Sequence, residues 1–517
     1  MQDKIRIGDE PVNNSVVGFD ANAHFDTPWL TRLIDQIPLL QTKENSSFTL
    51  SGEFAHLRPG VSQTSAVNDA IENNRLFEDE ENGLSFIDDF EGSDIGLSFM
   101  NPGRWNLAAA PAAVPGYGPD EMFFEENPPQ NPSTNIADKI ARSDLRGTFA
   151  WYSIPQNIDQ ILGGVNFNPE TEQVRVTDVF PNRDVLTEEN FISTLDVYFD
   201  PTKRGPYNYN ENLRTLLEDE PERTWSGMTT TLPSGQEDLT QNNIEFLEFW
   251  MQSVLPNGRS PSAQDLQDYE GKIYIDIGVV SEDVVPNFKT NTEDGLVRRP
   301  QDLQEDNISG QSRSYIPTPL PAPEGQFSND TRELSDVGLD GAPNEGGIAN
   351  KNEQNLFSEF IESMASEYGI ASDEYEQIVD DPSNDDYVYY GESQAGNGDL
   401  QERFSRMYGY HDGNTPPNEG EKRAVTNKPD TEGLITPSIV EQNNAYFQYE
   451  IDWNPADFSE LEPGSEGTFI VDKVDGANQQ DRWYQVRLPL EDWVRKVGGI
   501  ENFQNISYIR LCLPQYG

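Results

Sequence analysis

The chain has 517 residues, 35% of them hydrophobic and 10% aromatic, which suffices to build the cores of roughly two to four domains. Its 91 acidic and 35 basic residues leave a formal net charge of -56. Nucleic acids and anionic membrane surfaces are therefore disfavoured as partners, since both need patches of Lys and Arg. The acidic residues occur along the whole chain. A hydrated, salt-adapted surface is the simplest explanation of them, and cation binding is the alternative.

Cysteine content and the chain ends carry three further expectations. Cys512 is the sole cysteine, so no disulfide forms within the chain, and its apolar strand YIRLCL predicts a buried, inert thiol. The start MQDKIRIGDE lacks the features of a signal peptide, and no apolar run is long enough for a membrane-spanning helix. Because NISYIRLCLPQYG stops as a strand ends, we expect an internal piece of a longer polypeptide.

The N-terminal segment contains two strands with strict alternation. VVGFDANAHF (16–25) places Phe19 and Phe25 on one face and polar residues on the other, and SFTLSGEFAHL (47–57) repeats the pattern. TPWLTRLIDQIP between them predicts a short amphipathic helix. Strands of about ten residues suffice to cross an outer membrane, whereas an ordinary half-buried sheet is the alternative. Two strands cannot close a barrel, so the rest of any barrel would lie outside this chain.

From residue 84 the pattern changes to short, aromatic-rich strands between loops rich in Pro, Gly and Asn, which is typical of a β-sandwich. SFIDDFEGS (85–93) opens this part and joins it to the N-terminal strands. NIEFLEFWM (243–251) is apolar on both faces and predicts a central, covered strand. Ile275 and Ile277 share one face of GKIYIDIGVV and predict a core face. The other strands expected here are LSFIDDF, GTFAWYSI, QVRVTDVF and TLDVYFD.

Strand signals fade after residue 280 into sequence rich in Asp, Asn, Gly and Pro, which predicts a large surface insertion or lid. It contains one expected helix, from about Asn352 to Tyr368. Its inward residues would be Leu356, Phe357, Phe360, Ile361 and Met364. Strands return as AYFQYEIDW, GTFIVDKV, DRWYQVRLPL and NISYIRLCL. The expected domains are 1–83 (barrel-type strands and helix), 84–280 (first part of the sandwich), 281–440 (acidic insertion) and 441–517 (closing strands).

The opening DDFE and the closing strands resemble those of galactose-binding-like jelly rolls, a resemblance that concerns fold alone. The predicted fold class is therefore mainly β. It comprises a jelly-roll-like β-sandwich with a large acidic loop and helix insertion, preceded by two amphipathic barrel-type strands joined by a short helix.

Catalytic constellations are not evident. His24, His56 and His411 are far apart and lack metal-ligand spacing, and no G-x-S-x-G elbow occurs. Paired carboxylates are common by chance among 91 acids. We therefore predict no catalytic residue, no required cofactor and no enzymatic activity.

Three acidic loops are candidates for structural Ca²⁺, which takes six to eight oxygen ligands in flexible geometry. Solvated turns are the alternative, because none has full EF-hand spacing. The candidate ligands are Asp89 and Glu91 at the head of the sandwich, Asp336 and Asp340 in DVGLDG, and Asp381, Asp385 and Asp386 in DPSNDDY. For Asp89 and Glu91 the alternative is that they accept hydrogen bonds from loop amides.

Several unusual motifs in one order resemble the SprA (Sov) family of Bacteroidota. They are TRLIDQIPLLQTKENSSFTLSGEFAHLRPG, SFIDDFEGSDIGLSFMNPGRWNLA, RGTFAWYSI, RGPYNYN, NNIEFLEFWM, GKIYIDIGVVSEDV, DVGLDG and DPSNDDY. The resemblance implies the outer-membrane translocon of the type IX secretion system, linked to gliding motility, whose chain forms a very large β-barrel with soluble insertions. It further implies location at the outer membrane or cell surface. The implied partners are secreted cargo proteins and other secretion-system subunits.

Within these motifs, the aromatic residues are expected to pack in the core, and RGPYNYN (204–210) is the best candidate for an exposed loop. The scarce arginines are expected to bind carboxylates in bidentate pairs. The aromatic residues are Trp105, Trp151, Tyr152, Tyr207, Tyr209 and Trp250, and the arginines are Arg104, Arg146 and Arg204.

Two other functions stay open from the residues. One is a secreted, Ca²⁺-dependent carbohydrate-binding surface protein, in which the jelly roll stacks sugars on aromatic rings. The other is a polysaccharide-degrading enzyme.

Overall fold

The structure is a computed structural model. It describes residues 15–34, 36, 47–58, 96–112, 136–163, 173–181, 190–252, 270–296, 303–307, 310–318, 320, 325–327, 332–347, 350–391, 395, 400–406, 428–453, 463–464, 468–475 and 482–516. SFIDDFEGS (85–93), with the candidate ligands Asp89 and Glu91, lies outside these residues. The chain divides into two compact units, 1–97 and 98–517, which are treated separately here.

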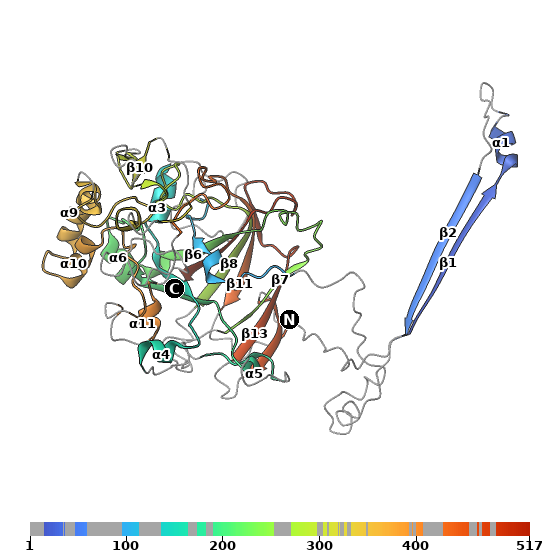
Figure 1. Ribbon diagram of the computed structural model, residues 1–517, viewed down its shortest axis with the longest axis horizontal. Coiled ribbons are helices and arrows are strands. Elements are labelled where there is room, and N and C mark those ends of the chain that lie inside the picture. The colour runs from blue at the N-terminus through green and yellow to red at the C-terminus, as the bar shows by residue number, and fades with distance from the viewer. Residues whose placement is uncertain are drawn as a thin grey trace. The chain divides into compact units, whose positions relative to one another are not determined.

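The first unit contains the predicted pair of strands. β1 (Ser15–Asp26) and β2 (Ser47–Arg58) pair in antiparallel register over their whole length, and α1 (Pro28–Ile34) follows β1 (Figure 1). Alternation aligns like with like across the hairpin, since Phe19 lies opposite Phe54. On the other face, Asn22 lies opposite Ser51. The hairpin therefore has one apolar and one polar face, as the alternation predicted.

The second unit is built on a large antiparallel sheet. Its described strands run in the order β14-β11-β8-β15-β6-β3. Their bounds are β14 (Arg495–Val497), β11 (Ala445–Trp453), β8 (Glu270–Val279), β15 (Tyr508–Tyr516), β6 (Trp225–Thr231) and β3 (Asn106–Leu107). Strands from the start and the end of this unit are thus neighbours, because the C-terminal β15 lies between β8 and β6.

A smaller antiparallel sheet faces the large one. It has the order β12-β13-β7, with β12 (Ile470–Asp475), β13 (Arg482–Pro489) and β7 (Phe246–Met251). A further pair joins β4 (Gly147–Tyr152) to β5 (Asp196–Arg204). Side chains of β8 and β11 share one buried cluster with those of β13, and Trp151 of β4 joins it. Two sheets enclosing a common apolar core are the defining feature of a β-sandwich, and the predicted mainly-β, sandwich-like fold is confirmed.

The central strand β8 shows why alternation predicted its core face. Ile275 and Ile277 are buried between the sheets. The opposite face of the strand is also covered, since Tyr274 packs with Trp225 and Cys512 in a second cluster. Cys512 is a buried free thiol whose pKa burial raises to about 12. The predicted burial of this thiol is confirmed.

Two strand predictions are wrong in ways that have a physical cause. NIEFLEFWM was expected to be central, but within the described strands β7 pairs only with β13 at the edge of its sheet. Its second apolar face is covered by a ring instead, because Phe180 meets Trp250 edge-on at 5.8 Å between centroids. QVRVTDVF was expected to be a strand, but Val176–Val179 form α5. Asp178 accepts a hydrogen bond from the Arg175 backbone amide, which caps a helical turn.

Short helices and a small β-pair account for the remaining elements. The helical ones are η2 (Pro102–Arg104), α3 (Ile136–Ser143), α4 (Ile158–Leu162), α6 (Leu213–Glu218), η4 (Pro221–Arg223), α7 (Arg332–Ser335), α8 (Glu353–Leu356), α9 (Ser358–Glu367), α10 (Asp373–Asp380) and α11 (Leu400–Phe404), and the pair is β9 (Leu303–Glu305) with β10 (Tyr315–Pro317). Among the described residues, no helix has the length and apolarity needed to cross a membrane.

The acidic segment 281–440 carries buried apolar side chains of its own. The predicted helix from Asn352 to Tyr368 is two helices, α8 and α9, which meet at Phe357. Its predicted inward residues Phe357, Phe360 and Met364 are buried, and they pack against Tyr207 and Tyr209 from the loop after β5. The segment is therefore joined to the sandwich through a shared apolar cluster.

Candidate functional site

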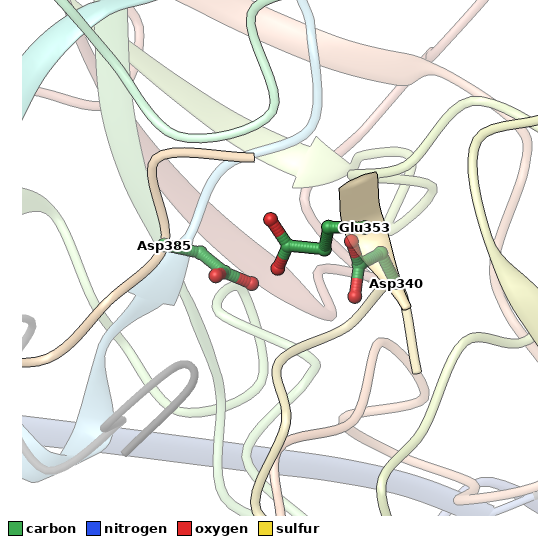
Figure 2. A group of neighbouring side chains, drawn as sticks. All are labelled: Asp340, Glu353 and Asp385. Atoms are coloured by element: carbon green, nitrogen blue, oxygen red, sulfur yellow. The ribbon is translucent and has the colours of Figure 1, made fainter. Parts of the chain in front are cut away.

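Three buried carboxylates from three separate segments meet beneath the acidic segment. Asp340 lies in the turn after α7, Glu353 is the first residue of α8, and Asp385 follows α10. One carboxylate oxygen from each lies within 4.8 Å of the other two, and the three carboxyl groups are turned toward one another (Figure 2). We call these three residues the carboxylate cluster.

Hydrogen bonding satisfies the cluster only in part. Asp340 Oδ1 accepts from the Ala342 amide at 2.9 Å, and Glu353 Oε2 accepts from the Ser383 amide at 2.9 Å. Asp340 Oδ2 and Glu353 Oε1 are buried, and no described residue donates a hydrogen bond to either atom. Asp385 has both oxygens bound, one by a hydroxyl of Tyr207 and the other by that of Ser383. Two carboxylate oxygens therefore face the cluster with no donor of their own.

Burial and mutual repulsion act in the same direction on these groups. Loss of solvent raises the pKa of each of the three carboxyls well above its usual range, and the neighbouring acids raise it further. For Glu353 those acids are Asp340, Asp385 and Asp381, and its one hydrogen bond to Ser383 offsets them only partly. Burial and repulsion between the three carboxyl groups thus both disfavour their charged forms in the absence of a neighbouring positive charge.

Other buried acids in the same segment are fully bound, which sets the carboxylate cluster apart. Three buried glutamates accept backbone amides with both carboxylate oxygens, and thereby hold together loops that are far apart in sequence. The acceptors are Glu282, Glu293 and Glu432, and the donors are the amides of Leu434, Glu441, Val337, Gly338, Asp430, Val285 and Asn291. Part of the acidity thus has a structural use, as amide acceptors in a region with little regular structure.

The predicted Ca²⁺ ligands divide between places. Asp340 and Asp385 belong to the carboxylate cluster, and Asp385 also lies in a second group with Asp381 and Asp386. In that group Asp381 accepts the amides of Asp385 and Asp386 and lies 3.5 Å from Arg406. Asp336 is in neither group, since it forms an ion pair with Arg332 at 2.7 Å.

Glu353 is the cluster member that the sequence did not single out. A glutamate at the start of a helix is ordinarily explained by the helix dipole and is usually exposed. Here it is fully buried, because Asn352 caps α8 and the cap lies in the interior. The only available signal was its position four residues before the buried Phe357.

The loop RGPYNYN (204–210) forms one wall of the site, although it was expected to be exposed. Tyr207, Asn208 and Tyr209 are buried, so this prediction is wrong. Tyr207 has φ of 57°, a strained value for a non-glycine residue, and its hydroxyl donates to Asp385 and accepts from the Leu339 amide. The loop therefore joins the turn of Asp340 to that of Asp385.

The arginines expected to hold carboxylates bind backbone carbonyl groups instead. Arg104 donates to Ser98 and Thr231, Arg146 to Pro206 and Ala108, and Arg204 to Asn208 and Pro382. Loops leave many carbonyl oxygens without a regular partner, and a guanidinium with five N–H groups can satisfy several of them. The expectation of bidentate acid pairs at these three positions is wrong.

A small cavity adjoins the cluster. It has a volume of about 50 Å³, and Tyr207, Leu339 and Asp385 line it together with Glu282, Asp430 and Glu432. This is room for a few water molecules beside Asp385.

The first unit presents a different candidate surface. Phe19 and Phe54 are 66% and 61% exposed, and their neighbours Val17, Phe25, Phe48 and Leu50 are exposed as well. These six residues form the apolar face of the β1–β2 hairpin. Across the opposite face His24 Nδ1 lies 2.9 Å from Thr49 Oγ1 in a polar pair.

Comparison with known proteins gives one family match. A family described as motility related/secretion protein matches residues 359–517, which include α10, Asp385 and the closing strands of the sandwich. No curated protein matches the chain. A motility or secretion family is not a family of enzymes, and it indicates a location in the cell envelope or at the cell surface.

Proposed function

The match of residues 359–517 supports assignment of the chain to the SprA family, and on that premise we propose that it is part of an outer-membrane, protein-conducting translocon. The system would be the type IX secretion system that also serves gliding motility. Its partners would be secreted cargo proteins and other subunits of the same machinery. The chain would supply membrane-embedded strands and an adjoining cap module outside the bilayer.

The observation that carries this proposal is the apolar face of the hairpin. Six large apolar side chains are exposed on one face of two twelve-residue strands, and the other face is polar. Transmembrane strands have this dyad repeat, with apolar residues toward lipid and polar residues toward the lumen. A soluble hairpin with this face in water would be an aggregation site.

The second unit supports the cap role by its architecture. Its sandwich core and its amide-accepting glutamates hold many loops together, and the described residues include no constellation that suggests catalysis. Rigid loops on a scaffold are suited to docking partners or to limiting passage through a channel.

The test places a charge on each face of the hairpin in the bacterium that encodes the chain. Phe19→Asp with Phe54→Asp should lower the amount of secreted protein in the medium at least tenfold and stop colony spreading, because each buried charge is costly in lipid. The matched control, Asn22→Asp with Ser51→Asp, adds the same charge to the polar face and should leave both readouts near the parental level. Equal secretion by the two strains, with equal protein in the membrane fraction, would sink the proposal.

A spectroscopic test guards against misfolding of the charged variant. Cys512 is buried, so a cysteine introduced on the hairpin is the reactive thiol. A fluorophore at Phe19→Cys or Phe54→Cys should be quenched by nitroxide-labelled lipids in isolated membranes, whereas one at Asn22→Cys or Ser51→Cys should not. Quenching that is the same on both faces would contradict a lipid-facing role.

A further inference from the structure

The carboxylate cluster lacks the partners that the structure supplies to its other buried acids. Asp340 and Glu353 each have one fully buried carboxylate oxygen that receives no hydrogen bond from the described part of the chain. A buried acceptor left without a partner costs more than a lost surface hydrogen bond, so such groups call for an explanation.

No side-chain cation neutralises the cluster. Within the described part of the chain, no Lys or Arg forms an ion pair with Asp340, Glu353 or Asp385. Arg204 is the guanidinium nearby, but its hydrogen bonds go to the carbonyl groups of Asn208 and Pro382. Among the described residues, the three buried acids thus converge with no Lys or Arg in ion-pair contact, although the charge of Arg204 is felt by Glu353.

Tyr209 is an independent sign that a group is missing from this space. The residue is 7% exposed, and its ring stacks on Phe357 at 4.2 Å between centroids. Its hydroxyl has no hydrogen-bond partner among the residues that the structure describes. Burial, and then the charges of Asp340 and Glu353, raise its pKa, which places the tyrosine beside the cluster. A buried hydroxyl and two buried carboxylate oxygens therefore share one unsatisfied region.

We propose that Asp340, Glu353 and Asp385 bind one Ca²⁺ ion, which ties the turn after α7, the start of α8 and the turn after α10 to one another. The oxygens lie no more than 4.8 Å apart, which is the largest separation possible for two oxygens that bind one ion with bonds of about 2.4 Å. Remaining ligands come from backbone carbonyl groups and from water in the adjoining cavity.

The donor set selects calcium among common metals. All three side-chain ligands are carboxylates, so the site favours a hard cation over Zn²⁺ or Cu²⁺, which prefer nitrogen and sulfur. Mg²⁺ needs near-ideal octahedral geometry with bonds of about 2.0–2.1 Å and keeps several waters. The three residues are buried, with Asp340 and Asp385 on irregular turns and Glu353 at the start of α8, which suits the larger and more tolerant ion.

The ion would act on folding, because its ligands come from segments that are distant in sequence. Glu353 and Asp385 are separated by α9 and α10, and Asp340 lies before both. A site that exists only in the folded chain converts binding free energy into stability. The cap module would be most stable where calcium is plentiful, as it is outside the cell.

Calcium binding by the full chain tests the proposal directly. After chelation and dialysis, the number of Ca²⁺ ions bound in 0.3 M NaCl should be one lower in Asp340→Asn and in Glu353→Gln than in the unsubstituted chain. Salt at this strength weakens the nonspecific attraction of ions to surface acids. Addition of 5 mM Ca²⁺ should raise the Tm of the unsubstituted chain by about 3 °C or more and that of the two variants by less.

Asp336→Asn is the matched control, since it removes an acid from the same loop whose partner is Arg332. It should bind as many Ca²⁺ ions as the unsubstituted chain even where it lowers Tm. Equal stoichiometry in all four proteins would overturn the proposal, as would occupancy by Mg²⁺ in preference to Ca²⁺. If both cluster variants misfold, Tb³⁺ can be used as a probe of the unsubstituted chain. Bound Tb³⁺ should show tyrosine-sensitised emission, which Ca²⁺ should reduce by displacing the Tb³⁺ ion and which Tyr209→Phe should weaken. Emission unchanged by Ca²⁺ would equally overturn the site.

Discussion

Two buried acidic centres in the second unit differ in how their charge is balanced. In the sheet, Arg510, Asp276, Gln448 and Arg495 lie opposite one another across four neighbouring strands. Arg510 lies 2.6 Å from Asp276 Oδ2, and Gln448 donates to the other oxygen at 2.9 Å. In the loops, none of the described Lys and Arg residues forms an ion pair with the carboxylate cluster. The regular register of the sheet places Arg510 and Gln448 on either side of Asp276, whereas the loops bring three acids to one another.

This difference shows that burial alone does not determine the role of an acid. Asp276 of β8 forms a structural ion pair with Arg510 of the C-terminal strand β15. This pair stabilises the pairing of these two strands. Asp340 and Glu353 have oxygens that the protein does not satisfy. Of these two centres, only the carboxylate cluster has the unsatisfied oxygen atoms that a bound ligand would need.

The largest effect should come from breaking the ion pair in the sheet. Arg510→Met leaves the carboxylate of Asp276 fully buried without its guanidinium, and should lower the free energy of unfolding by about 3–5 kcal/mol. Urea denaturation of the chain measures it. Adding Asp276→Leu to this variant should recover most of the loss, since an apolar pair leaves no uncompensated charge. If Arg510→Met alone has the same free energy of unfolding as the parent chain, Asp276 does not depend on its ion pair and the contrast between the two centres is wrong.

A somewhat smaller effect is expected where the cluster is packed against the backbone. Gly338 has φ of +76°, and an added Cβ would lie 1.9 Å from Asp385 Oδ2, so Gly338→Ala should cost about 2–4 kcal/mol. Gly235 is the control, because it has φ of +84° but no atom within 4 Å of the added Cβ. Gly235→Ala should cost only about 1 kcal/mol. Equal losses in thermal unfolding would mean that the contact with Asp385 does not matter.

The smallest effect is expected at Asp196, which is half-buried and so represents a third environment for an acid. Burial raises its pKa to about 6, and its hydrogen bonds to Thr194 and Ile154 offset this only in part. The folded state therefore holds a proton that the unfolded chain releases near pH 4, so stability falls as pH rises from about 4 to about 6. Relative to Asp196→Asn, the parent chain should lose about 2 kcal/mol over this window. Parallel pH profiles of the two proteins would contradict the raised pKa.

Much of the sandwich was predictable because one-dimensional patterns determine it. Strict alternation in GKIYIDIGVV identified Ile275 and Ile277 as core residues, and both are buried. The same reasoning failed for β7. An apolar second face shows that other residues cover the strand, and here the covering residue is Phe180, next to α5, and not a strand of another sheet. Sequence patterns show that a face is covered without showing what covers it.

The candidate site was predictable only in part for a related reason. DVGLDG and DPSNDDY were recognised as acidic loops rich in turn residues, and Asp340 and Asp385 are indeed brought together. Nothing local distinguishes Asp340 from Asp336 in the same loop, yet one faces Glu353 and the other Arg332. Which of the two aspartates joins the cluster depends on the path of the chain after α7.

Periodicity and composition by themselves determined the β class of the chain, the two-faced hairpin, the core face of β8 and the inert Cys512. Those features depend on neighbours in sequence, which set the face that each side chain takes. Tertiary structure alone decided that RGPYNYN is buried, that its arginine binds carbonyl groups, and that Glu353 completes a cluster with two distant aspartates. These outcomes depend on which loops meet, and loop contacts are determined by the packing of the whole unit.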